Sequence, residues 1–258
     1  LQGADELKEA EEKYLPTNGR RVNAIILAAS RGDELGILTK SIPKSLLNIK
    51  GKTILENQIE EFNHVGIKMI TVVRGFEKNK YNLSNIKMVD NDDYERTKDL
   101  YSLYLAISEL KSHTVISYGD IIFKKFILND LLNDQNDITV IVDADCDLEE
   151  GSRDYVETTN RYSRNIFLEN VGLKKVSSSL PKQKIHGEFI GLWKVNEKGA
   201  LVIKDTLNEM AQENDFRHNS IGDLFNRILE KHHISVKYIR GGWLNINTII
   251  DLQKAGEI

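Results

Sequence analysis

The residues of this chain best suited to chemistry follow its first apolar run. Residues 24–29 (AIILAA) are apolar and β-branched enough to form a strand buried on both faces. The next residues, 30–36, contain two glycines, and Pro43-Lys44 follows. Backbone N–H groups in a glycine-bearing loop favour phosphate, and a lysine constrained by a neighbouring proline can reach the same anion. This spacing predicts a phosphate site suited to a nucleoside triphosphate.

A second group of candidates consists of oxygen ligands. Asp120 follows Gly119 at the end of an apolar run, where a carboxylate can hold magnesium or, alternatively, cap a turn or helix. Asn247 lies near the C-terminus, directly before Thr248. Its amide oxygen could bind the same cation, although Asn247 and Thr248 could also simply cap the last helix.

The elements that position these residues alternate between strand and helix. Strands are predicted at residues 24–29, 69–73, 115–117, 138–142, 190–194 and 236–239, and helices at 54–65, 100–110, 124–133, 198–211 and 221–231. The alternation predicts an α/β fold with a mostly parallel sheet covered on both faces. Ligands bind beyond the carboxyl ends of such strands, so the loops after Ala29, Val73 and Ser117 are expected to line one cleft. Residues 143–170 are polar and weakly patterned, which predicts a flexible flap.

The composition excludes several classes of protein. The chain has 258 residues, of which 40% are hydrophobic and 29% charged, as in an ordinary globular protein. Its net charge of −4 argues against non-specific nucleic-acid binding. Cys146 is the one cysteine, so a disulfide framework is impossible and a reducing, cytoplasmic location is expected. No apolar run approaches ~18 residues, so no transmembrane helix is expected.

The residues around Lys44 also carry a resemblance. LAAS-RG-x-x-L-x-x-LT-x-x-x-PK-x-LL resembles the signature of the sugar-phosphate and choline-phosphate nucleotidyltransferases, LAAG-x-G-x-R-L-x-P-LT followed by PK. Glu34 stands where that family carries its phosphate-binding arginine, so either Arg31 supplies the charge or the site is altered. LAASRGDELG and GDIIF are similar to a narrower branch, the cytidylyltransferase domain fused behind phosphoenolpyruvate mutase in phosphonate biosynthesis.

The resemblance implies a Rossmann-like three-layer nucleotidyltransferase fold, α/β, with a mixed, mostly parallel sheet. It implies Mg²⁺-dependent transfer of CMP from CTP to 2-hydroxyethylphosphonate or 2-aminoethylphosphonate, with release of pyrophosphate. Residues 1–20 would be the helical tail of an upstream mutase domain plus a linker, and residues 21–258 the cytidylyltransferase domain. The mutase would then be a partner within the same polypeptide.

The resemblance also implies roles for particular residues. Lys44, Arg31 and Asp120 would act in catalysis, and Asp120, Asn245 and Asn247 would hold Mg²⁺. The nucleotide would contact Leu27, Ala28, Ala29, Ser30, Gly32, Arg74, Thr97, Ser102 and Gly119, although Thr97 or Asp99 could instead cap the helix. The phosphonate acceptor would contact Arg153, Lys175 and Glu188, since a guanidinium can bind a phosphonate dianion through two hydrogen bonds.

Two other functions remain open at this point. A phosphocholine cytidylyltransferase would need an aromatic cage for the quaternary ammonium, and the available rings are those of Tyr101, Tyr104, Trp193 and Trp243. A catalytically weak regulatory nucleotide-binding domain is the other alternative. It is suggested by Glu34 at the arginine position and by Asn245 where this branch is expected to carry an acid.

Overall fold

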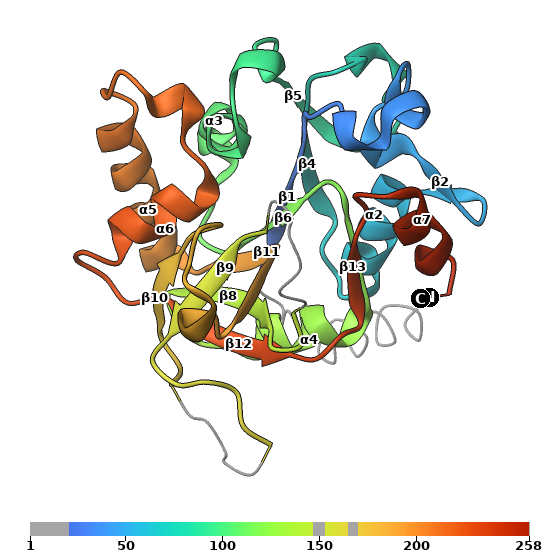
Figure 1. Ribbon diagram of the computed structural model, residues 1–258. Helices are drawn as coiled ribbons and strands as arrows, with labels where there is room; N and C mark the ends of the chain where they lie inside the picture. The colour runs from blue at the N-terminus through green and yellow to red at the C-terminus, as the bar shows by residue number, and fades with distance from the viewer. Residues whose placement is uncertain (1–20, 147–152, 165–169, 258) are drawn as a thin grey trace, which may run out of the picture.

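The computed structural model describes residues 21–146, 153–164 and 170–257, which form an α/β fold (Figure 1). Residues 1–20, expected to be a mutase tail and linker, lie outside the described residues. The strands are β1 Asn23–Ala28, β2 Asn48–Ile49, β3 Lys52–Thr53, β4 Met69–Arg74, β5 Lys87–Asp90, β6 Thr114–Tyr118, β7 Ile121–Phe123, β8 Ile138–Asp143, β9 Tyr155–Thr158, β10 Leu173–Val176, β11 Gly187–Val195, β12 Ser235–Ile239 and β13 Trp243–Asn245. The α-helices are α2 Ile54–His64, α3 Asp99–Leu105, α4 Lys125–Asn133, α5 Glu197–Met210, α6 Ile221–Ile228 and α7 Ile249–Ala255.

The main sheet has the order β10-β9-β11-β6-β1-β4-β5, with β8 paired to β11 and β12 paired to β8. Strand β1 is parallel to both β4 and β6, and β4 is parallel to β5. Strand β11 is antiparallel to β6, β8 and β9. The predicted α/β fold with a mixed sheet is therefore confirmed. The carboxyl ends of β1, β4 and β6 meet at one edge, where the predicted cleft belongs.

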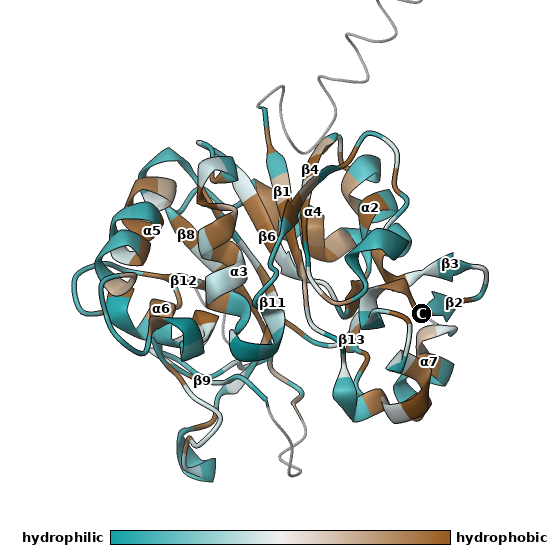
Figure 2. Ribbon diagram, turned by 90° about the horizontal axis from the view of Figure 1, so that it is seen from above, coloured by the Kyte–Doolittle hydropathy of each residue, from teal (hydrophilic) through white to brown (hydrophobic). Residues whose placement is uncertain are grey.

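Both faces of β1 are buried, because its side chains alternate between two cores. Ile25 and Leu27 belong to the core under α3, α5 and α6, whereas Ala24 and Ile26 belong to the core under α2 and α4. Figure 2 shows these two helical layers on either side of the strands. An apolar run without polar alternation is thus the expected sequence of a central strand in a three-layer fold.

A third, smaller core attaches the C-terminus to the sheet edge. Ile246 and Ala255 pack with Leu35, Leu47 and other apolar residues of the segments before α2. Figure 1 shows β13 and α7 beside α2 and β2, away from α5 and α6. None of the helices in the described residues combines the length and apolar character that crossing a bilayer requires.

The flap predicted over residues 143–170 is wrong for its middle part. Tyr155–Thr158 forms β9, which pairs with β10 and β11 inside the main sheet. Three of its four residues are buried, and strand pairing satisfies their backbone groups. Residues 147–152 and 165–169 lie outside the described residues. The helix predicted at 100–110 ends at Leu105 and continues as the short 3-10 turn Ile107–Glu109.

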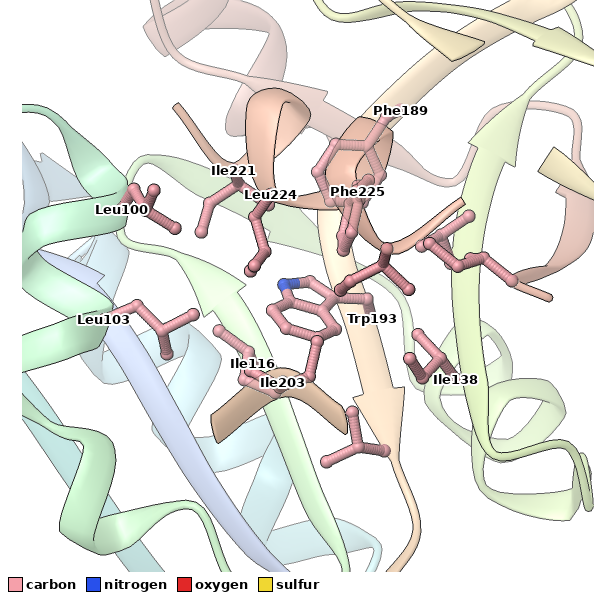
Figure 3. Close-up of a cluster of buried hydrophobic side chains, with 14 of the residues drawn as sticks. Leu100, Leu103, Ile116, Ile138, Phe189, Trp193, Ile203, Ile221, Leu224 and Phe225 are labelled. Atoms are coloured by element: carbon pink, nitrogen blue, oxygen red, sulfur yellow. The ribbon is translucent and has the colours of Figure 1, made fainter. Parts of the chain in front are cut away.

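Trp193 on β11 lies at the centre of the larger core (Figure 3). Its side chain is fully buried, and its ring contacts that of Phe225 on α6 edge-on, with the centroids 5.1 Å apart. Phe225 in turn contacts Phe189, at 5.3 Å between centroids. These rings join β11 to α6.

We expect Trp193→Ala to lower the free energy of unfolding by about 3–5 kcal/mol, because it leaves a large cavity in a core that cannot fully collapse. Leu201→Ala on α5 is the matched control. Leu201 is 57% exposed, so its truncation should lower the free energy of unfolding only slightly. Urea denaturation followed by circular dichroism measures both changes. Equal losses in the two variants would contradict the central packing role of Trp193.

Candidate active site

Three loops meet at the carboxyl end of β1, as the sequence predicted. The Gly119 amide after β6 donates to the Leu27 carbonyl at 2.8 Å, and the Phe76 amide after β4 donates to the Ala29 carbonyl at 3.0 Å. Gly119 permits this approach, because a Cβ there would lie 2.6 Å from the Cβ of Ala28. The residues predicted on these loops are thus brought together by backbone hydrogen bonds.

The loop after β1 folds over the side chain of Lys44. Gly32 has φ +83°, and a Cβ at this position would lie 2.7 Å from the Cβ of Lys44. The Lys44 amide donates to the Arg31 carbonyl at 3.2 Å, and the Thr39 hydroxyl donates to the Gly32 carbonyl at 2.6 Å. A glycine is required here both for its left-handed backbone and for the space that the lysine occupies.

The Lys44 ammonium is the centre of the site. It donates to Glu34 Oε1 at 2.5 Å, to Asp120 Oδ2 at 2.7 Å and to Asn247 Oδ1 at 2.7 Å. An ammonium has three N–H donors, and these three acceptors account for all of them. The lysine side chain is only 3% exposed, compared with 24% for Asp120 and 44% for Glu34. The predicted convergence of Lys44 and Asp120 is therefore present in the structure.

Lys44 remains charged despite its burial. Burial by itself lowers the pKa of Lys44, but the negative charge of Asp120 and the hydrogen bonds to Asp120 and Glu34 more than offset this effect. The net result is a pKa raised above the usual lysine value. A buried ammonium with carboxylate and amide partners is therefore a fixed positive charge at this edge of the sheet.

The helix-cap interpretation of Asn247-Thr248 is confirmed by the structure. Thr248 caps α7: its hydroxyl accepts from the Asp251 amide at 3.1 Å, and Asp251 Oδ2 accepts from the Thr248 amide at 2.7 Å. The same Asp251 oxygen accepts from the Asn247 amide at 3.0 Å. The cap thus fixes the backbone of Asn247 while its side chain reaches Lys44.

Oxygen ligands suitable for a hard cation lie next to this lysine. Asp120 Oδ1 and Asn245 Oδ1 are both buried, and neither has a hydrogen-bond partner within the described residues. The Ile246 amide donates to the Asp120 carbonyl at 3.0 Å, which places the two segments side by side. Asn245 and Asn247 are two positions apart, the spacing that directs side chains to one side of an extended chain. Magnesium prefers such carboxylate and amide oxygens, so the residues fit the ion.

Arg31 lies on the same loop, but its side chain is not among the partners of the Lys44 ammonium. Its guanidinium lies over the ring of Phe76, 4.5 Å from the centroid, and its Nε is 3.6 Å from Asp33 Oδ1. The Arg31 side chain is 40% exposed. Ser30, beside it, is also exposed. Arg31 and Ser30 are therefore accessible to a ligand that approaches from solvent.

Arg74, Thr97 and Ser102 belong to one polar network around the buried Asn91. The Asn91 side-chain amide donates to the hydroxyls of Thr97 and Ser102, at 3.0 Å in each case. Arg74 donates to Asp90 Oδ1 at 2.7 Å, and its carbonyl accepts from the Asn91 amide at 2.8 Å. The structure brings these three predicted nucleotide contacts together. Thr97 does not cap α3, whose N-cap residue is Lys98 without a side-chain cap.

Of the residues predicted to contact the acceptor, Arg153 and Glu188 lie together. Arg153 Nη1 is 2.6 Å from Glu188 Oε2, and Glu188 is buried on β11. Lys175 is exposed on the edge strand β10, three places from β6 in the sheet. The structure thus pairs two of the predicted acceptor residues and leaves Lys175 at the sheet edge.

Sequence reasoning missed the role of an acidic pair beside these residues. The Tyr118 hydroxyl lies 2.8 Å from Asp99 Oδ2 and 3.2 Å from Asp154 Oδ2. Burial raises the pKa of Asp154 to about 6, and the nearby charge of Asp99 adds to the shift. Burial likewise raises the pKa of Asp99. The one available signal in the sequence was the position of Asp154 between Arg153 and an apolar strand. Asp99 and Asp154 are 55 positions apart, so only the fold brings them to the same hydroxyl.

Comparisons with known proteins identify the family and several relatives of this chain. The family model of the MobA-like NTP transferase domain matches residues 24–153. The chain is 25% identical over 254 residues to a CTP:phosphoglutamine cytidylyltransferase of Campylobacter jejuni, covering 90% of this chain and 98% of that protein. It is 35% identical over 114 residues to a choline-phosphate cytidylyltransferase of Streptococcus pneumoniae, covering 43% of this chain and 50% of the relative. It is 30% identical over 112 residues to a 2-aminoethylphosphonate cytidylyltransferase of Lancefieldella rimae, covering 41% and 46%. The last two alignments span about half of each relative.

Solved structures show the same fold. The structure of CTP:phosphocholine cytidylyltransferase from Streptococcus pneumoniae superposes with a TM-score of 0.72 at 22% identity, covering 92% of this chain and 98% of that one. The inositol-1-phosphate CTP transferase from T. maritima superposes with a TM-score of 0.71 at 17% identity, covering 91% and 96%. The family match over residues 24–153, half of the chain, shows that the chain belongs to the family of MobA-like NTP transferase domains.

Proposed function

We propose that this chain is a magnesium-dependent cytidylyltransferase that transfers CMP from CTP to a small phosphonate, 2-hydroxyethylphosphonate or 2-aminoethylphosphonate, and releases pyrophosphate. The observation that carries the proposal is the convergence of Lys44, Asp120 and Asn247 at the carboxyl end of the central strands. A fixed cation beside oxygen ligands is what transfer at a phosphorus atom requires. Three curated relatives are named as cytidylyltransferases, which supports CTP as the nucleotide.

The chemistry needs no covalent enzyme intermediate. A phosphonate oxygen attacks the α-phosphorus of CTP, the new P–O bond forms, and the bond to the leaving pyrophosphate oxygen breaks. Lys44 stabilises negative charge on the non-bridging oxygens, and Arg31 on the same loop adds positive charge. Because Lys44 is already held in place, little reorganisation is needed when charge develops. Asp120, Asn245 and Asn247 would hold Mg²⁺, which neutralises phosphate charge when bound.

The acidic pair favours the amine-bearing acceptor of the two. Asp99 and Asp154 are held close together by the Tyr118 hydroxyl, and their raised pKa values mean that burying both charges destabilises the fold. An ammonium group between them would relieve that repulsion. Arg153, oriented by Glu188, would hold the phosphonate end of the same molecule. These contacts support 2-aminoethylphosphonate over 2-hydroxyethylphosphonate.

Two of the rings available for a choline cage, those of Tyr101 and Tyr104, lie beside each other, with centroids 6.4 Å apart, whereas the two tryptophans are engaged in other contacts. Tyr101 packs on Phe216, and Arg217 covers its ring. Trp193 is inside the core, and the Trp243 indole donates to Asp143 at 2.6 Å. A quaternary ammonium is recognised by several rings around one point, so this arrangement gives phosphocholine less support.

An acceptor series tests the proposal directly. Pyrophosphate release should be measured with CTP, MgCl₂ and, in turn, 2-aminoethylphosphonate, 2-hydroxyethylphosphonate and phosphocholine. We expect the largest kcat/KM with 2-aminoethylphosphonate, and little turnover when ATP, GTP or UTP replaces CTP. Preference for phosphocholine would support that alternative function. Tight CTP binding without turnover of any acceptor would support a regulatory domain.

Lys44→Ala should abolish turnover, with a loss of at least about 10³-fold in kcat/KM, because it removes the fixed charge at the reacting phosphate. Lys40→Ala is the control, since Lys40 is an exposed lysine four positions earlier. Thermal unfolding should show that both variants are folded. Turnover of Lys44→Ala at the wild-type rate would rule out this mechanism.

Asp154→Asn should stabilise the fold above pH 6 and weaken recognition of the amine. The pKa of Asp154 is about 6 in the folded protein, above its usual value of 3.8, so the unfolded chain loses this proton first. Wild-type stability should therefore fall between about pH 4 and pH 6 and stay lower above that window. The amide of Asp154→Asn has no charge to bury, so the free energy of unfolding should rise by about 1–3 kcal/mol at pH 8 and change little at pH 4.

Urea unfolding at pH 4 and pH 8 measures this stability change, with Asp92→Asn as the control because the Asp92 side chain is 74% exposed. The KM for 2-aminoethylphosphonate should rise at least about tenfold, while that for 2-hydroxyethylphosphonate should change little, as expected for a lost charge-assisted contact. A destabilised variant with unchanged KM values would show that Asp154 is structural.

A further inference from the structure

Glu34 is the member of the Lys44 cluster whose charge is least suited to a triphosphate site. Its carboxylate is 2.5 Å from the Lys44 ammonium, in the loop that should face the phosphates. Two glycines with positive φ, Gly32 at +83° and Gly36 at +56°, lie on either side of it. Glu34 therefore occupies the position where an anionic ligand would meet the lysine.

A phosphate group cannot reach Lys44 unless one of its present partners leaves. All three N–H donors of the ammonium are used, by Glu34, Asp120 and Asn247. Asn247 is fixed by the cap of α7, and Asp120 directly precedes the strand pair β7–β13. Glu34 is 44% exposed within the 3-10 segment Asp33–Thr39, so its side chain can rotate into solvent at the smallest cost. It is the partner that a ligand would displace.

The local charges explain when this displacement is favourable. Lys44 contributes +1, and Glu34 and Asp120 contribute −1 each, so the cluster carries −1 in total. A triphosphate, which is itself strongly negative, is repelled by such a cluster. A divalent cation held at Asp120, Asn245 and Asn247 would change the sum from −1 to +1 and make the same position attractive.

We propose that Glu34 is an internal substitute for a phosphate group and that it makes triphosphate binding depend on a divalent cation. In the nucleotide-free protein it neutralises Lys44. When the metal and the triphosphate arrive together, Glu34 turns into solvent and the phosphate takes its place on the lysine. This inference rests on the proposed function, because it takes a nucleoside triphosphate as the anion that Lys44 binds. Glu34 is thus a specificity residue that admits the metal–nucleotide complex and rejects the free nucleotide.

The experiment measures CTP binding to the intact chain by isothermal titration calorimetry, once in excess MgCl₂ and once in excess EDTA. Removal of the metal should weaken CTP binding to the wild type at least about 100-fold, but CTP binding to Glu34→Gln no more than about tenfold. Both factors lie within the usual range of coupling between two ligands. Glu34→Arg, which reverses the charge, should bind CTP in EDTA at least as tightly as Glu34→Gln.

Glu213→Gln is the matched control, because it also removes a carboxylate from an ion pair. Glu213 Oε1 lies 2.9 Å from Arg227 Nη1, and the Glu213 side chain is about as exposed as that of Glu34. Its metal dependence should equal that of the wild type. Equal metal dependence in wild type and Glu34→Gln would overturn this inference while leaving the proposed function intact. Failure of all these proteins to bind CTP even with MgCl₂ would overturn the proposed function and this inference with it.

Discussion

The structure depends on one buried ammonium that must be neutralised by groups from distant parts of the chain. Removing a lysine charge from water is costly unless hydrogen-bonded acceptors replace the water. Lys44 obtains them from Glu34, Asp120 and Asn247, which lie 10, 76 and 203 positions away. Gly32 leaves the space that the lysine side chain occupies, and the cap of α7 holds Asn247 within reach of the ammonium.

The same requirement produces a site that is ordered before any ligand arrives. Lys44 is positioned by its partners, and Asn247 is positioned by the cap of α7. A second group of charges is less well compensated: Asp99 and Asp154 both lie at the Tyr118 hydroxyl, and burial raises the pKa of each carboxyl. Buried groups that destabilise a fold are typical of sites shaped for a ligand. In the proposed function, the substrates compensate these buried charges: a metal–triphosphate binds at Lys44, and an ammonium group binds at Asp99 and Asp154.

Much of the architecture could be predicted from local pattern. The runs at residues 24–29 and 138–142 are buried strands, and the helices at 54–65 and 198–211 begin and end within one residue of the observed bounds. Periodicity reports which face is buried, so it works well for long, strongly apolar elements. It failed for β9, because a strand of four residues inside a polar stretch has too little pattern to stand out.

The candidate site, too, was predictable from the sequence only in part. The sequence by itself determined that a glycine loop, Lys44 and Asp120 follow parallel strands, and parallel strands in one sheet bring their carboxyl ends together. It also contained the cap signal at Asn247 and Thr248. Only the tertiary structure decided that Glu34 turns onto Lys44 and that Asp99 meets Asp154 across the Tyr118 hydroxyl. The reason is physical: spacing along the chain constrains neighbours within an element, whereas contacts between charged side chains from separate loops depend on burial and on which partners the fold leaves within reach.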